Sequence, residues 1–331
     1  FASGAAWAGV PLWEAAGPPL AVDVLRTCDA DVTPGADATA AYEGLGANVL
    51  DAVARDGGYR QLVAPVVHGL SGAFGLSTES YLSVQNAGAS DATVTVWAQV
   101  EESCDPVRCR DLSIRPGERA SVPAAACGGA PWRGGMWAES DVPVALAVDT
   151  VGGDMLTTYE GTADALAHDA TGAPLRDASS LVLHGPLLVD PRYGWSTRVT
   201  VQNLSRTDPA GVTVEWLDRA GRWLGDATHG PFCTGDAWTF TLDATDAAPG
   251  LAVGSVRVTS IVPPGPPIPD QAPAPIAAVA HLTQYADASA TEPLAAVAYR
   301  LLPEGLVLDG VPLGRHAPAA GGAAAAALPQ V

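Results

Sequence analysis

A short segment with the pattern of a β-strand occurs twice in this chain, and that duplication constrains the fold more than any other feature. Residues 80–86 read SYLSVQN and residues 197–203 read TRVTVQN, so the two phrases begin 117 residues apart. Each is followed by a second alternating run, ATVTVWAQV at 92–100 and GVTVEWLD at 211–218. Alternation of apolar and polar residues with a period of two is typical of β-strands with one buried face. The repetition therefore predicts a strand-rich unit that is present twice.

The similarity extends beyond these phrases, in the same order in both copies. The paired segments are 67–69 and 183–185 (VHG and LHG), 112–123 and 236–244, and 137–150 and 256–282. We align Trp97 with Trp216, because each stands near the end of the second strand. His68 and His184 take equivalent places, which favours a structural role over two copies of an active site.

The repeated unit starts with the VQN strand and ends with a hairpin. We expect this closing hairpin three times, although the opening strands are found only twice. LTTYEG (156–161) and LAAVAYR (294–300) close the two copies, whereas PLAVDV (19–24) and TAAYEG (39–44) form a third closing pair at the front. The surplus hairpin either adds edge strands to the first domain or completes a sheet in a neighbouring subunit, since unpaired strand edges attract other strands. The residues expected to join subunits in the second case are Pro19, Leu20, Val22, Val24 and Tyr42.

The composition agrees with an all-β chain and argues against some classes of binding partner. The 28 Pro and 36 Gly indicate many turns, and the net charge of -19, with Arg as the only basic residue apart from His, argues against binding nucleic acid. No apolar run is long enough to span a membrane. Because residue 1 is Phe and not Met, we expect that an export signal was removed and that the protein is extracellular or on the cell surface.

Five cysteines in an exported chain predict disulfides with one thiol left over. Cys104 and Cys109 flank the turn sequence DPVR and are the preferred pair, with Cys127 as a competing partner for either. Asn203, in the sequon Asn-Leu-Ser at a strand end, is a candidate glycosylation site.

No motif for a nucleophile, a phosphate loop or a dinucleotide site is present, so we expect no enzyme activity and no cofactor. Asp29, Asp31 and Asp37 lie in one turn and form a weak candidate for calcium, with a solvated acidic turn as the alternative. Three tryptophans near Gly-rich loops are either platforms for sugar rings or buried core residues: Trp132, Trp137 and Trp223.

The order of phrases resembles the tandem β-sandwich modules of secreted bacterial cell-surface proteins. The resemblance rests on VTVQN, VTVEW, IRPGERASV, ESDVPVALAV and the closing Tyr, and it covers roughly residues 60–300. It implies an immunoglobulin-like fold, export, and a structural or adhesive role.

We therefore expect two tandem immunoglobulin-like β-sandwich domains with an extra N-terminal hairpin. The expected boundaries are 1–60 (hairpin and linker), 61–165 (first domain), 166–310 (second domain) and 311–331 (low-complexity tail). The function expected is a structural subunit of an extracellular bacterial filament or surface assembly, whose copies are joined by strand addition from a terminal segment. The alternative is a carbohydrate-binding or adhesive module, with glycans as partners.

Overall fold

A computed structural model of the 331-residue chain describes most of the two repeated regions. The described residues are 23–28, 38–43, 62–69, 78–128, 131–152, 155–163, 181–189, 194–205, 208–242, 253–263, 272–285 and 293–303.

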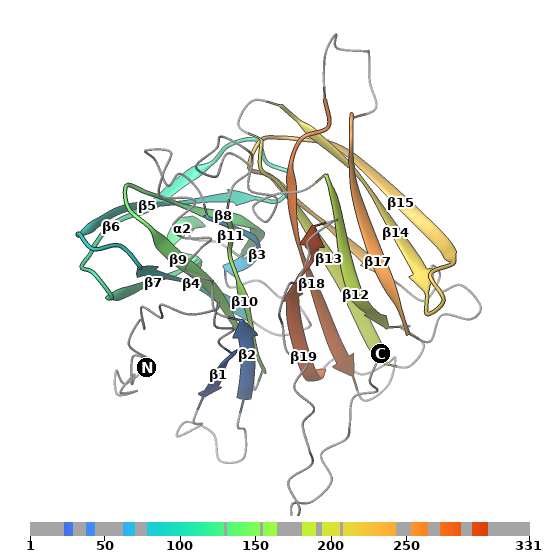
Figure 1. The fold of residues 1–331 in the computed structure, drawn as a ribbon, viewed down its shortest axis with the longest axis horizontal. Helices are drawn as coiled ribbons and strands as arrows, with labels where there is room; N and C mark the ends of the chain where they lie inside the picture. Colours follow the sequence, from blue (N-terminus) through green and yellow to red (C-terminus); the bar gives the residue numbers. More distant parts are fainter. Residues whose placement is uncertain are drawn as a thin grey trace, which may run out of the picture.

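Strands dominate these residues, which confirms the all-β fold predicted from the sequence (Figure 1). The strands of the first repeated region are β3 (Leu62–Gly69), β4 (Thr78–Asn86), β5 (Ala92–Val100), β6 (Val107–Ile114), β7 (Arg119–Pro123), β8 (Trp132–Ser140), β9 (Val144–Gly152), β10 (Met155–Glu160) and β11 (Thr162–Ala163), with one helical turn, α2 (Ala125–Gly128). Those of the second are β12 (Val182–Val189), β13 (Trp195–Asn203), β14 (Ala210–Asp218), β15 (Trp223–Phe232), β16 (Ala237–Leu242), β17 (Val253–Ile261), β18 (Ile276–Tyr285), β19 (Pro293–Arg300) and β20 (Leu302–Pro303).

The two regions have the same strand order, as the repeated phrases predict. The first contains a four-stranded sheet, β10-β9-β4-β7, and a five-stranded sheet, β11-β3-β8-β5-β6. The second contains β19-β18-β13-β16 and β20-β12-β17-β14-β15, and each strand corresponds to one in the first region. The strand pairings among the described residues are antiparallel.

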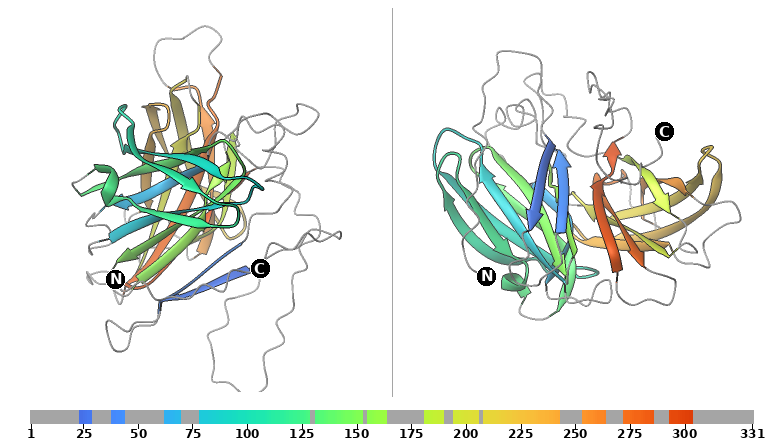
Figure 2. Two further views of the ribbon diagram at one scale, coloured as in Figure 1. Left: turned by 90° about the vertical axis from the view of Figure 1, so that its left-hand side faces the viewer. Right: turned by 90° about the horizontal axis from the view of Figure 1, so that it is seen from below.

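Each pair of sheets encloses its own apolar core, so each region is a β-sandwich. The first core includes Leu82, Val94 and Met136, and the second includes Val201, Val214 and Leu282. Figure 2 shows the two sandwiches side by side. We call them the first sandwich (62–163) and the second sandwich (182–303).

A separate two-stranded sheet is formed by β1 (Asp23–Cys28) and β2 (Ala38–Glu43). These strands pair antiparallel, and Val24 lies opposite Tyr42. β2 contacts β10, the edge strand of the first four-stranded sheet, in the same chain.

The asparagine of the repeated VQN segment has the same structural role in both sandwiches: its side chain closes the turn that follows β4 or β13. The Nδ2 atom of Asn86 donates to the carbonyls of Ser90 and Ile114, and its Oδ1 accepts from the Gly88 N–H. Asn203 does the same with the Asp208 and Cys233 carbonyls and the Ser205 N–H. Both asparagines are buried, at 0% and 1% exposure, so these bonds satisfy backbone groups that would otherwise be buried without partners.

The expected alignment of Trp97 with Trp216 is wrong by one position. Trp216 lies 5% exposed in the second core and stacks on Phe240, whereas Ala98 is its counterpart in the first core. Trp97 lies on the opposite face of its strand, where its partner across β8 is Trp137. A one-residue shift moves a strand side chain to the other face of the sheet.

Among the described residues, no helical segment has both the length and the hydrophobicity that a membrane-spanning helix requires.

Candidate functional site

The two sandwiches meet face to face. We call this contact the junction and take it as the candidate functional site, because it combines a buried aromatic cluster, a disulfide and a hydrogen bond between the two sandwiches. The outer face of the second four-stranded sheet packs on the outer face of the first five-stranded sheet: Trp137 of β8, Leu204 and Ala277 of β18 form one buried cluster, with Trp97 against it. Trp97 and Trp137 are nearly parallel, with ring centroids 6.2 Å apart. A layer of aromatic and small residues therefore fills the contact.

Glycine permits the two faces to approach closely. A Cβ atom on Gly135 of β8 would lie 2.5 Å from Nε2 of Gln202, and one on Gly235 would lie 3.0 Å from Oε1 of Gln99. Gly235 also has φ of +74°, which disfavours other residues. Both glutamines are fully buried.

A disulfide and a hydrogen bond fasten one end of this junction. Cys104, in the turn after β5, is bonded to Cys233, in the turn before β16. Beside it, the Glu102 N–H donates to Oδ1 of Asp236 over 3.0 Å. Burial raises the pKa of the Asp236 carboxyl to about 6, despite hydrogen bonds from the Ala237 and Glu102 N–H groups that lower it.

At the other end of the junction, the equivalent edge strands β10 and β19 are in contact. Nearby, the rings of Tyr159 and His281 meet edge to face, with centroids 6.0 Å apart. Burial, together with the positive charge of Arg198, lowers the pKa of His281 to about 3. This histidine is therefore neutral at neutral pH.

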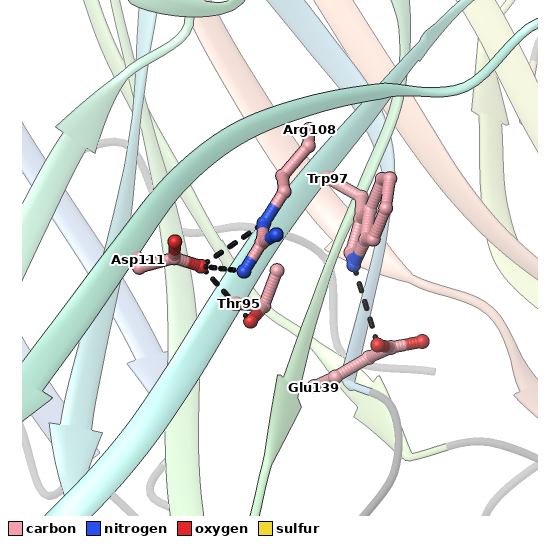
Figure 3. Close-up of polar contacts among 5 residues, drawn as sticks. All are labelled: Thr95, Trp97, Arg108, Asp111 and Glu139. Atoms are coloured by element: carbon pink, nitrogen blue, oxygen red, sulfur yellow. Dashed lines mark hydrogen bonds and ion pairs between the residues drawn. The ribbon is translucent and has the colours of Figure 1, made fainter.

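Next to the junction, a polar row lies on the same outer face of the first five-stranded sheet (Figure 3); Arg108 and Asp111 are exposed, and Thr95, Trp97 and Glu139 are partly buried. Nε1 of Trp97 donates to Oε2 of Glu139 over 3.3 Å. Oδ1 of Asp111 accepts from Arg108 at 2.6 Å and from the Thr95 hydroxyl at 3.1 Å. The hydrogen bond from Arg108 holds the pKa of Asp111 below its ordinary value.

The disulfide predicted between Cys104 and Cys109 is wrong. Cys109 lies within the extended strand β6 and is bonded to Cys127 of α2, one of the alternatives, while Cys104 precedes β6 and faces the second sandwich. An extended strand separates Cys109 from Cys104 and directs it to its own sandwich. Cys28 ends β1, and its side chain is outside the described residues.

Asn203 does not fit its expected role as a glycosylation site. Its side chain is 1% exposed, and Nδ2, the atom that would carry a glycan, donates to the Asp208 and Cys233 carbonyls. Of the tryptophans considered as sugar platforms, Trp132 and Trp137 are buried, at 6% and 7%, and Trp223 is 59% exposed.

Other predicted residues lie outside what the structure describes. These are the calcium candidates Asp29, Asp31 and Asp37, and the joining residues Pro19, Leu20 and Val22. Within the described part of the chain, no group of three or more His, Cys, Asp or Glu is placed to hold a metal ion.

The junction residues were missed in the sequence, although one signal was present. Positions 276–283 of β18, IAAVAHLT, are all buried, and a nearly continuous apolar run is typical of a strand covered on both faces. By contrast, no local sequence pattern indicates the contact between Trp137 and Gly235 or the disulfide between Cys104 and Cys233.

Comparison with known proteins does not assign a family. No family model matches the chain, and no curated protein does. A crystal structure of Thermotoga maritima 1070 is similar over 32% of this chain and 96% of its own, at 21% identity and a TM-score of 0.26. Allantoicase from Saccharomyces cerevisiae is similar over 61% of this chain and 73% of its own, at 11% identity and a TM-score of 0.17. At such low TM-scores neither similarity supports an argument about fold or function.

Proposed function

We propose that this chain is a structural subunit of an extracellular assembly made from copies of itself, built on two immunoglobulin-like sandwiches. The observation that carries the proposal is the junction, which joins two sandwiches of equal topology by a disulfide and a buried face. Two modules locked together in this way suit a part that transmits load between neighbours. The disulfides are compatible with an oxidising compartment.

Strand addition from a terminal segment is the proposed way of joining copies, and β16 is the sheet edge best suited to receive a strand. Its sequence, AWTFTL, contains no charge, proline or glycine. The equivalent strand β7 contains Arg119 and ends at Pro123, and β6 carries Arg108, Arg110 and Asp111. Charges and proline protect an edge from pairing.

Electron microscopy and light scattering of the intact chain over a concentration series test the proposal. We expect filaments or oligomers whose mass rises with concentration. A monomer at every concentration would contradict a structural assembly. Deleting residues 1–44 tests the hairpin as donor, because unimpaired assembly of the shortened chain excludes it and leaves the C-terminal segment.

A carbohydrate-binding module is the second candidate, supported by the partly exposed polar row around Trp97. An indole beside Glu139, Asp111 and Arg108 combines a stacking surface with groups that hydrogen-bond hydroxyls. Glycan-array binding that disappears in Trp97→Ala, but survives in Trp223→Ala, would support it. Absence of binding by the intact chain would exclude it.

A further inference from the structure

The face that the second sandwich buries in the junction has a counterpart on the first sandwich, and among the described residues the part of that counterpart around Gln85 is exposed. Gln202 lies opposite Ala277, and its Nε2 donates to the Gly235 carbonyl over 3.0 Å. In the first sandwich Gln85 lies opposite Ala145, and its Nε2 donates to the Gly117 carbonyl over 3.3 Å.

The surrounding residues of the two faces also correspond. Gly117 and Gly235 have φ of +76° and +74°, and each donates its N–H to the carbonyl of the VQN asparagine. On both faces two hydroxyls pair across the sheet: Ser83 with Ser121 at 2.9 Å, and Thr200 with Thr239 at 2.8 Å. The two faces are therefore built alike.

Their surroundings differ. A Cβ atom on Gly235 would meet Gln99 and Trp137, whereas one on Gly117 would have no atom within 4 Å. Gln202 is fully buried and Gln85 is exposed. We call the surface at Gln85, Gly117 and Ala145 the open face.

The other side of the junction also has a counterpart, on the second sandwich. In the first sandwich Gln99 lies opposite Gly135 and supports the junction. The equivalent pair is Leu217 and Ser255, because Trp216 corresponds to Ala98. Both are only partly buried.

This second surface is apolar where it is uncovered. Trp223, opposite Leu217, is 59% exposed, and Val253 is 44% exposed. Val253 lies two residues from Ser255 on β17, so the two side chains are on one face. We call the surface at Leu217, Trp223, Val253 and Ser255 the apolar end.

Charge favours contact between the open face and the apolar end. Glu118 takes the place of Asp236, since the Glu118 and Asp236 carbonyls accept from the N–H groups of Asn86 and Asn203. Asp236 meets the turn after β5, and the equivalent turn after β14 carries the exposed Arg219. The Glu118 carboxylate, which pairs with Arg115 at 3.8 Å within its own copy, would therefore face the Arg219 guanidinium of the other copy as a second cation.

We propose that the apolar end of one copy packs on the open face of a second copy, repeating between chains the junction that each chain already contains. The inference rests on the proposed function and adds the surfaces through which copies meet. Such a contact is heterologous, because it joins two different surfaces, and it extends into an open chain of subunits unless the rotation closes it. Arg115 stands where Cys233 stands, three residues before the equivalent carboxylate, so no disulfide can form between copies at this place.

Two surface substitutions in the full chain test the inference. Gln85→Arg alters the open face, and Ser255→Glu alters the apolar end. Their counterparts, Gln202 and Gly135, are in direct contact within the junction. Val107→Glu, at a residue of β6 that is 43% exposed and outside both surfaces, is the control.

We expect sedimentation velocity to show self-association of the unmodified chain, weakened by about tenfold or more in each single variant. An equimolar mixture of the two variants should recover association to within about threefold, because the introduced charges attract and the remaining pair of surfaces is unmodified. Val107→Glu should associate like the unmodified chain. Unchanged thermal unfolding of each variant confirms that its fold is intact.

Two results would overturn the inference, and they differ in what they leave standing. If the unmodified chain associates but Gln85→Arg and Ser255→Glu associate equally well, the copies meet elsewhere and the proposed function survives. If the unmodified chain stays monomeric at all concentrations, both the contact and the structural assembly are excluded.

Discussion

The two four-stranded sheets have the same strand order but different surroundings, and the burial of their inner strands β18 and β9 differs accordingly. All of the first eight residues of β18 are buried, including His281 on the outer face. In β9, the equivalent strand, Ala145 and Ala147 remain partly exposed. One topology therefore supports either a covered or a partly exposed sheet, and the residues of the opposing face that contact the covered sheet include Trp137 and Gly135.

The largest effect should come from the aromatic layer. Trp137→Ala removes a buried indole and should lower the free energy of unfolding by about 3–5 kcal/mol. Arg257 is the equivalent residue on the second sandwich, where it pairs with Glu215 at 2.6 Å near the surface. Arg257→Ala should cost at most about 1 kcal/mol. Urea denaturation followed by circular dichroism measures both, and equal losses would contradict the assigned difference between the two faces.

The disulfides should rank next, and unequally. Cys104 and Cys233 are 129 residues apart in sequence, whereas Cys109 and Cys127 are 18 apart. Chain-entropy arguments give more stabilisation to the longer loop, about 2–4 kcal/mol or more. Replacing Cys104 and Cys233 by alanine should therefore destabilise more than replacing the other pair.

Calorimetry of the two double variants checks this order. In the variant without the Cys104–Cys233 bond, the two sandwiches should also begin to unfold in separate transitions, because the cross-link that fastens their junction is gone and only the polypeptide backbone connects them. A single transition shifted no further than that of the Cys109–Cys127 variant would refute the special role of the junction bond.

The smallest effect concerns pH. Because burial raises the pKa of Asp236 to about 6, its contribution to stability is greatest below the ordinary value of 3.8 and is lost as pH rises through 6. Between pH 7 and pH 5 it should add roughly 1 kcal/mol. His281 acts in the opposite direction, since its lowered pKa removes stability as pH falls below 6.5.

Comparison with Asp236→Asn isolates the aspartate, because the contribution of His281 is common to both proteins. The difference in unfolding free energy between the two should change by about that amount from pH 7 to pH 5. A pH-independent difference for Asp236→Asn would contradict the assignment.

Local pattern in the sequence predicted the strands and the repetition, because alternation and turn residues are local properties. The sequence pattern gave a wrong alignment where a shift of one residue changes the face of the sheet. Trp97 and Trp216 look equivalent in the sequence, yet Trp97 lies on the outer face of its sheet and Trp216 lies in the core. It also failed for Asn203, whose sequon carries no information about the backbone carbonyls that occupy its amide.

The junction could not be derived from the sequence, since it depends on residues more than a hundred positions apart. Cys104 had a nearby cysteine that looked like a suitable partner, and only the placement of the second sandwich brings Cys233 closer. The small residues at Gly135 and Gly235 become meaningful only when Gln202 and Gln99 are seen against them.

The bond between Cys104 and Cys233 also has a mechanical consequence. Tension applied to the chain on either side of the two cysteines passes through the sulfur bridge, so the residues between them are bypassed. That bypassed segment includes β8, β9, β13 and β14, which are inner strands of the four sheets. A subunit pulled from its ends can therefore extend only by its outer segments while the bond is intact, which places an upper limit on how far each copy can stretch.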